Sequence, residues 1–77
     1  MLFRSGKDIF IDNNLTIPVL TAGYQVTVRN DSSSAIGFTL SGTTSPNNSD
    51  TQISAYGTIA VLYQNTTTVW IDGNTEA

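Results

Sequence analysis

Apolar and polar residues alternate along much of this chain, and two stretches show the pattern most clearly. In residues 24–30, Tyr24, Val26 and Val28 alternate with polar residues, and residues 35–41 repeat the same rhythm. A period of two is typical of a β-strand that buries one face and exposes the other. We therefore predict two half-buried antiparallel strands at these positions.

A different pattern marks residues 55–73, which we interpret as two strands joined by a short polar turn. The first, at 58–63, is apolar on both sides after Thr58, and the second, at 67–71, is β-branched and aromatic. A strand that is apolar on both faces must be covered on both faces. Because so short a chain has few elements to provide that cover, we expect another copy or another protein to provide part of it.

Three shorter stretches, 8–12, 15–19 and 51–55, also have strand-forming compositions. Asn tolerates positive φ, so the Asn pair at 13–14 predicts a hairpin turn between the first two stretches. Pro18 cannot donate a backbone hydrogen bond. The strand that contains it is therefore predicted to lie at a sheet edge or to end at the proline.

The predicted fold class is all-β. No stretch combines a 3.6-residue period with a cap, and Thr, Val and Ile prevail where helix formers would be needed. About six to seven strands at short, regular spacing are typical of a small antiparallel β-sandwich or barrel, or of a prism built by several chains. The two-sided apolar strand at 58–63 favours a unit that packs as an oligomer.

The chain divides into an arm at 1–7, a single all-β domain at 8–73 and a loose polar tail at 74–77. The arm is either a frayed terminus or a segment that docks on a neighbouring subunit through Phe3. The longest irregular stretch, 42–50, contains only turn residues and is predicted to be a surface loop. Such a loop acts either as a solvated linker or in recognition.

Composition bears on the class of protein. Only 12% of the 77 residues are charged, where about 25% is usual. The net charge of −3 disfavours nucleic-acid binding, which needs a concentrated cationic surface. Low charge also gives little protection against self-association, which supports a component of an assembly. No apolar run approaches the roughly 20 residues of a membrane span, so no membrane partner is expected.

The titratable residues offer little chemistry. The chain has no His and no Cys, which excludes a Ser-His-Asp or Cys-His nucleophile within it and removes the commonest metal ligands. Asp8 and Asp12 would share one face of a strand but lie roughly 13 Å apart, too far for an acid–base pair. The oxygen-rich stretch 47–50 lacks the spacing of a calcium loop. We therefore expect no catalytic, metal or cofactor site and no enzymatic activity.

Aromatic residues are the remaining candidates for binding. If its two neighbours in the chain face the core, Trp70 faces the opposite side, toward solvent, a ligand or another subunit. Trp and Tyr are enriched in protein interfaces, so we predict that Trp70 and Tyr63 lie at a subunit interface. The alternative is a sugar-stacking platform, which these two residues would form with Tyr24 and Tyr56.

Three motifs resemble those of a known family. They are Thr-Ile-Pro at 16–18, Gly-x-x-Val-Thr-Val-x-Asn at 23–30, and Gly-x-x-x-Val-Leu-Tyr at 57–63 followed by Trp70. Their order resembles that in the small β-modules of tailed-bacteriophage virion proteins, both tail-fibre ends and head decorations. The likeness spans roughly residues 14–73. Modules of this family are commonly trimeric, so the resemblance implies a homotrimer whose strands pack around one axis.

The function that the resemblance implies is that of a non-enzymatic virion structural protein. We expect a capsid decoration or cement subunit that binds the major capsid protein or another virion protein. It would be located in the virion, after assembly in the host cytoplasm. Such a subunit stabilises the shell by mass action, because it binds the assembled state only.

The short arm bears on the choice between head and tail. An arm of only residues 1–7 before the first strand suits a complete small protein added to a shell, and the capsid-contact candidates are Leu2, Phe3 and Arg4. The alternative is the receptor-binding tip of a tail fibre. That tip would recognise a cell-surface glycan through the loop at 42–50 and exposed aromatic residues.

Overall fold

The computed structural model describes residues 4–77, which form eight β-strands and no helix. The all-β prediction is therefore confirmed for this part of the chain. In the same residues no helix is long and apolar enough to cross a membrane. The strands are β1 (Lys7–Ile11), β2 (Leu15–Ile17), β3 (Gln25–Asn30), β4 (Ile36–Leu40), β5 (Gln52–Ile53), β6 (Thr58–Tyr63), β7 (Val69–Gly73) and β8 (Thr75–Glu76).

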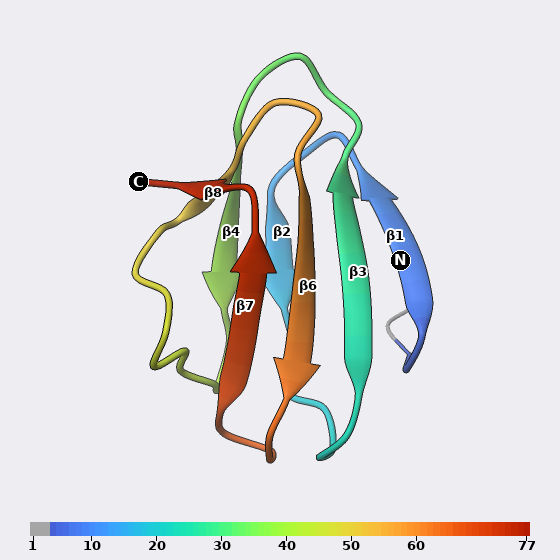
Figure 1. Cartoon of the computed structure of the whole chain (residues 1–77), viewed down its shortest axis with the longest axis vertical. Helices are drawn as coiled ribbons and strands as arrows, with labels where there is room; N and C mark the ends of the chain where they lie inside the picture. Colours follow the sequence, from blue (N-terminus) through green and yellow to red (C-terminus); the bar gives the residue numbers. More distant parts are fainter. Residues whose placement is uncertain (1–3) are drawn as a thin grey trace.

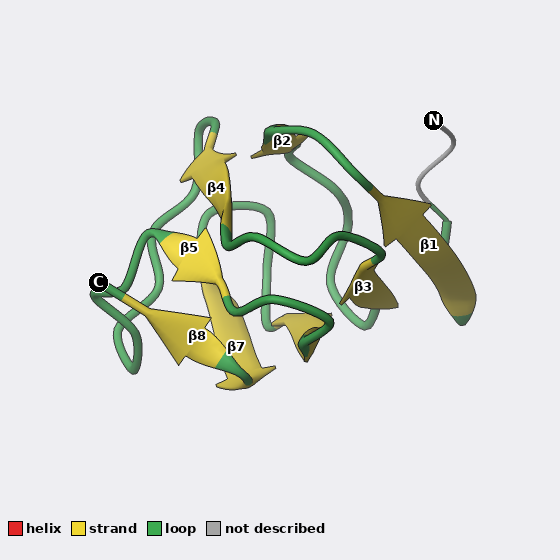
Figure 2. Cartoon of the chain, turned by 90° about the horizontal axis from the view of Figure 1, so that it is seen from above, coloured by secondary structure: helices red, strands yellow, loops and turns green. Residues whose placement is uncertain are grey.

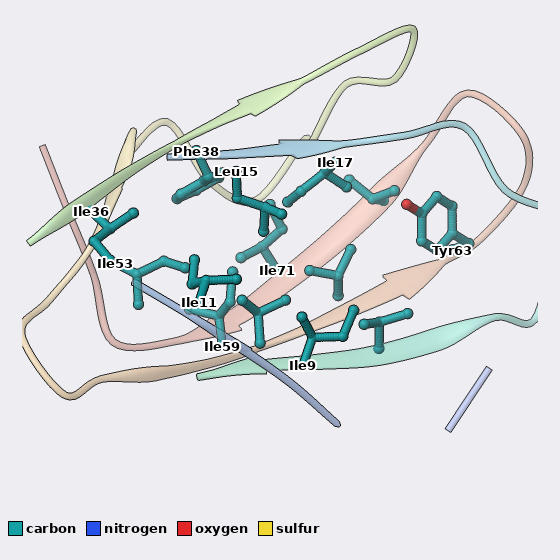
Figure 3. Close-up of a cluster of buried hydrophobic side chains, with 14 residues drawn as sticks. Ile9, Ile11, Leu15, Ile17, Ile36, Phe38, Ile53, Ile59, Tyr63 and Ile71 are labelled. Atoms are coloured by element: carbon teal, nitrogen blue, oxygen red, sulfur yellow. The ribbon is translucent and has the colours of Figure 1, made fainter. Parts of the chain in front are cut away.

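The strands form two four-stranded sheets, in the orders β1-β3-β6-β7 and β2-β4-β5-β8. The first sheet lies in front in Figure 1, and Figure 2 shows β2 and β4 on one side of the molecule with β3 and β7 on the other. Alternate side chains of each sheet point toward the other sheet and form one core, shown in Figure 3. The core residues are Ile9, Ile11, Leu15, Ile17, Val26, Val28, Ile36, Phe38, Ile53, Ile59, Val61, Tyr63, Val69 and Ile71.

β1 and β2 do not form the predicted hairpin. They lie in different sheets, and each pairs in parallel with a later strand, β1 with β3 and β2 with β4. The residues at 12–14 therefore carry the chain across the core. In this arrangement the apolar face of β1, with Ile9 and Ile11, and that of β2, with Leu15 and Ile17, line the same core from opposite sides. A hairpin would have left both faces to be covered by other elements.

The parallel pairs also make both sheets mixed. β3 pairs in parallel with β1 and antiparallel with β6, while β4 pairs in parallel with β2 and antiparallel with β5. The expectation of a purely antiparallel fold is therefore wrong. Period-two alternation reports which face of a strand is buried, but it carries no information about the direction of the neighbouring strand.

Two other strand predictions are confirmed. β2 is an edge strand and ends at Ile17, directly before Pro18. β6 and β7 form the expected antiparallel pair, with Leu62 opposite Trp70. The turn between them closes where the Gln64 backbone N–H donates a hydrogen bond to the Thr68 carbonyl oxygen.

The end of the chain differs from the loose tail expected at 74–77. Thr75 and Glu76 form β8, which pairs antiparallel with β5. The chain leaves the first sheet at Gly73 and enters the second sheet at Thr75, so the crossing brings it to the exposed edge of β5. The Gln52 side chain donates a further hydrogen bond to the Ala77 carbonyl oxygen, at 2.9 Å.

The crossing at Gly73 requires glycine. Its φ of +134° is a conformation that residues with a side chain rarely adopt, and a Cβ atom there would collide with the Thr58 carbonyl oxygen and lie 2.9 Å from the Ile59 Cα. These obstacles are backbone atoms of the neighbouring strand. They can move only if β6 and β7 separate.

We expect Gly73→Ala to lower the free energy of unfolding by about 3 kcal/mol or more, because both strain and steric clash oppose it. Gly23→Ala is the matched control, since Gly23 also has a positive φ but has nothing within 4 Å of its added Cβ. Gly23→Ala should lower the free energy of unfolding by only about 1–2 kcal/mol. Urea unfolding followed by circular dichroism measures both, and equal losses would contradict the role of the close approach.

Candidate functional site

Residues 4–77 contain no detected pocket, and no group of three or more His, Cys, Asp or Glu side chains among them is placed to hold a metal ion. Asp8 lies beside Arg29, with 3.4 Å between the carboxylate Oδ2 and the guanidinium Nη2. The two side chains are 54% and 42% exposed, so this ion pair contributes little to stability. The candidate binding residues lie on the surface of the protein.

One surface of the first sheet is exposed to solvent. There β1, β3, β6 and β7 present the side chains that alternate with the core positions, and we call this surface the outer face. It carries Phe10, Leu62 and Trp70, three of the five large hydrophobic side chains that are exposed in the described residues. The outer face consists of Asp8, Phe10, Gln25, Thr27, Arg29, Thr58, Ala60, Leu62, Trp70 and Asp72.

The outer face is apolar at two corners and small in the middle. Leu62 and Trp70 lie opposite each other across β6 and β7 and are 44% and 37% exposed. Phe10 lies at the other corner opposite Arg29, whose guanidinium carbon is 6.0 Å from the centre of the ring. Ala60 occupies the central part of the sheet, where a short side chain leaves the surface low.

β6 has the two apolar sides predicted for residues 58–63. Ile59 and Val61 are buried in the core, whereas Ala60 and Leu62 point to the outer face. The chain's own elements cover only the inward side of β6, the side of Ile59 and Val61. The prediction that another molecule covers the outward side of β6, with Ala60 and Leu62, stays a prediction.

Trp70 faces away from the core as predicted. Its neighbours Val69 and Ile71 are buried, while the Trp70 indole lies on the outer face. The indole N–H donates a hydrogen bond to the Gln64 side-chain oxygen at 2.6 Å. This bond satisfies the polar atom of the indole and restrains the ring, so the apolar ring surface is the part that remains for a partner.

Tyr63 has a different place from the one predicted for it. It lies at one end of the core in Figure 3 and is only 1% exposed, because it shares the inward side of β6 with Ile59 and Val61. Its hydroxyl donates a 2.6 Å hydrogen bond to the Pro18 carbonyl oxygen. The structure thus assigns Tyr63 to the core and not to a surface that a second subunit could contact.

The predicted capsid-contact residues lie at the start of the chain. Leu2 and Phe3 lie outside the described residues. Arg4 is exposed, and its carbonyl oxygen accepts a hydrogen bond from the Lys7 backbone N–H. The Gly6 N–H donates to the Gln25 carbonyl oxygen, so the last part of the predicted arm at 1–7 already lies along β3.

The loop at 42–50 lies against the edge of β7. The Thr44 backbone accepts a hydrogen bond from the Val69 N–H and donates one to Thr67. The Asn47 side chain accepts a bond from the Ile71 N–H at 3.1 Å and donates one to the Ile71 carbonyl oxygen at 2.9 Å. A side-chain amide here replaces a neighbouring strand. Nothing in the local sequence indicates this contact, because it joins residues 24 positions apart.

Tyr56 is exposed at a separate place. It lies in the turn between β5 and β6, has a positive φ of 54° and is 70% exposed. The turn leads into the first residue of β6, whereas Trp70 pairs with Leu62 near the last. Because Tyr63 is buried as well, the structure does not gather the four aromatic residues into the sugar-stacking platform considered above.

Of the residues predicted to contact the capsid or a second subunit, Trp70 and Arg4 are the exposed ones in the described part of the chain. Phe10 and Leu62 join Trp70 on the outer face through strand pairing, which the sequence pattern alone does not reveal. Comparison of the chain with protein-family models, with curated proteins and with solved structures found no match.

Tyr63 should make the protein sensitive to alkali. Burial raises the pKa of the Tyr63 phenol above its ordinary value of 10.0. The stabilisation from the neutral hydroxyl is therefore fully present below about pH 10 and is lost as the pH rises through the raised pKa of the folded state. We expect Tyr63→Phe to lower the free energy of unfolding by about 1 kcal/mol at pH 7. Above pH 10 this variant should lose less stability than the wild type does.

Urea unfolding between pH 7 and 11 measures this effect. Tyr56→Phe, which removes a hydroxyl from an exposed ring, is the control and should follow the wild-type curve. If the stability of Tyr63→Phe falls above pH 10 as much as that of the wild type, groups other than Tyr63 cause the alkaline loss of stability.

Loss of the Asn47 side chain should open the edge of β7. We expect Asn47→Ala to cost about 1–2 kcal/mol, because it removes two hydrogen bonds from the Ile71 backbone. Amide hydrogen exchange at Ile71 should become faster by an order of magnitude. Asn13→Ala is the control, since the Asn13 side chain accepts a bond only from the adjacent Asn14 N–H, and it should leave Ile71 exchange unchanged.

Proposed function

We propose that this chain is a non-enzymatic structural subunit that works as a homo-oligomer, and that its outer face is the contact surface between copies. One observation carries the proposal: Leu62 and Trp70 lie side by side and exposed on a broad sheet surface. Exposed apolar groups of this kind are typical of interaction sites. Aromatic residues are likewise enriched in protein interfaces.

The edges of the two sheets are poorer contact surfaces than the outer face. β1 carries charges at Lys7 and Asp8, and β2 has only three residues before Pro18. Charges, short strands and prolines are the usual protection of edge strands. The edge of β7 is covered by Thr44 and Asn47. Association is therefore expected through a face and not by adding strands to an edge.

The outer face has small side chains in the middle and larger ones at its corners, a shape that suits close contact between sheets. Packed sheets lie about 10 Å apart, a distance at which side chains from the two surfaces interdigitate. The low centre at Ala60 and Thr27 leaves room for a protruding side chain of a second copy. Phe10, Leu62 and Trp70 are the large apolar side chains that are exposed on this face.

We also interpret the two sheets as a β-sandwich. Each sheet has two end strands, β1 and β7 in the first and β2 and β8 in the second. A closed barrel would have no end strands. A sandwich leaves two broad outer surfaces, and such surfaces are what a subunit of an assembly needs for packing against neighbours.

The assembly that we propose is the one that the resemblance implies. The chain would act as a trimeric decoration or cement subunit of a phage head and stabilise the shell by binding only its assembled form. The second candidate is a glycan-binding fibre tip. The observation that favours it is the Trp70 ring, exposed and restrained by Gln64, because sugars stack on such rings.

Light scattering tests the oligomer. We expect a mass of about three chains of 8.3 kDa for the wild type. Trp70→Ser and Leu62→Ser should each weaken association at least 10-fold, which corresponds to about 1.4 kcal/mol. Val19→Ser is the matched control, since it also removes an exposed apolar side chain but lies outside the outer face. A folded monomer for the wild type would overturn the proposal.

Co-sedimentation separates the two candidate roles. A decoration subunit should pellet with empty heads assembled from the capsid protein of the same virus and should not bind cells. A fibre tip should bind purified host polysaccharide, and Trp70→Ser should abolish that binding. Binding to polysaccharide without binding to empty heads would replace the decoration role by the receptor-binding role.

A further inference from the structure

Charged side chains on the outer face are few, and their positions follow from the strand pairing. Asp8, Thr27, Ala60 and Asp72 form one row across β1, β3, β6 and β7, so a carboxylate lies at each end of the row. Arg29 lies on β3, two residues beyond Thr27 and on the same side of the strand. It is the one of the chain's three cations that the pairing places on this face.

Asp72 has no cationic partner among the described residues. The one ion pair between their side chains joins Arg29 to Asp8. Asp72 is exposed and shares the outward side of β7 with Trp70, which belongs to the proposed contact between copies. A surface that covers Trp70 therefore also takes Asp72 out of water. Because burial of a carboxylate without a cation is costly, the covering surface must supply a cation.

Arg29 is suited to supply that cation. Its guanidinium donates two hydrogen bonds within the chain, to the Asp8 Oδ2 and to the Thr58 Oγ1, both at 3.4 Å. These bonds are longer than the usual range of about 2.7–3.2 Å. A guanidinium has more N–H groups than the two bonds use, so donors remain for a second carboxylate. The Phe10 ring, whose centre is 6.0 Å from the guanidinium carbon, further restricts where the group can lie.

The row of carboxylates disfavours the two simplest ways in which two outer faces could meet. If two copies are centred on this row with a two-fold axis along the strands, Asp8 of one copy lies over Asp72 of the other. If the axis runs across the strands, each carboxylate lies over its own counterpart. Both arrangements bring like charges together, which opposes association. The copies must therefore meet displaced or turned relative to these arrangements.

The two halves of the outer face complement each other. The half on β1 and β3 carries Arg29 and Phe10, and the half on β6 and β7 carries Asp72, Leu62 and Trp70. When the first half of one copy meets the second half of the next, the cation lies against the unpaired carboxylate and aromatic residues lie on both sides. Contacts between unlike surfaces close into a ring when the rotation fits, which is compatible with a trimer.

We propose that Arg29 of one copy forms an ion pair with Asp72 of a neighbouring copy, and that this pair determines the register in which the outer faces meet. The inference rests on the proposed function, under which the outer face is the contact between copies. Arg29 then lies between two carboxylates, Asp8 of its own chain and Asp72 of the neighbour. The apolar side chains supply contact area in many registers, whereas the ion pair selects one, because charge complementarity acts mainly on specificity.

Charge reversal tests the ion pair. Arg29→Glu and Asp72→Arg should each weaken association at least 10-fold in light scattering of a dilution series, because each places like charges in the contact. The double variant Arg29→Glu/Asp72→Arg forms the pair in reverse and should associate within about 3-fold of the wild type. Circular dichroism checks the fold of each variant. If Arg29→Glu does not fold, Arg29→Gln removes the charge without adding repulsion from Asp8 and takes its place.

Two controls lie on β1. Lys7→Glu changes the net charge by the same amount as Arg29→Glu, but Lys7 lies on the side of β1 opposite to Asp8, so this variant should associate like the wild type. Asp8→Asn removes the partner of Arg29 within the chain and leaves Asp72 in place. It should not weaken association.

The outcomes separate the ion pair from the proposed function. A folded monomer for the wild type overturns the proposed function, and the ion pair with it. If the wild type associates but the single reversals do not weaken it, or the double variant does not restore it, the ion pair alone is overturned. An equal loss in Lys7→Glu would make net charge the cause, and an equal loss in Asp8→Asn would make Asp8 the partner. Either of these two results also overturns the ion pair with Asp72.

Discussion

Burial of a single core between two sheets is the interaction on which the rest of this structure depends. Neither sheet can bury its inward face alone, and the chain passes between them repeatedly, from β1 to β2 and finally from β7 to β8. Each crossing places apolar residues of adjacent segments on opposite sides of one core. The parallel pairs of β1 with β3 and of β2 with β4 follow from this, because each crossing reverses the direction of the chain and every second strand therefore runs the same way (Figure 1).

The same constraint explains where the fold needs particular residues. At Gly73 the chain leaves one sheet so close to β6 that no side chain fits. Tyr63 closes one end of the core and satisfies its hydroxyl at Pro18, where β2 stops. At the other end the Asn30 side chain joins the carbonyl oxygen of Ile53, the last residue of β5, and two carbonyl oxygens of the connections that cross between the layers. Polar groups are thus confined to the ends of the core, where the crossings leave carbonyl groups without strand partners.

With the inward faces committed to the core, interaction is left to the outer surfaces. The outer face carries its exposed apolar groups on three strands, and the turn at 54–57 carries one aromatic ring on a strained backbone. The two surfaces differ in character: the first is a sheet surface with apolar groups at two corners, and the second is a turn with one exposed ring.

The sequence by itself determined the fold class and the buried faces. Alternation in 24–30 and 35–41 identified Val26, Val28, Ile36 and Phe38 as core residues, and the order of residues around Trp70 determined its outward direction. These properties are local, since a side chain's face depends on its position along one strand. Only the tertiary structure decided that the Asn13-Asn14 turn crosses the core, that Tyr63 is buried, that Thr75 and Glu76 form a strand and that Asn47 covers β7. Each of these depends on which distant segment becomes a neighbour, and that choice is made by the shared core and not by any short stretch of the chain.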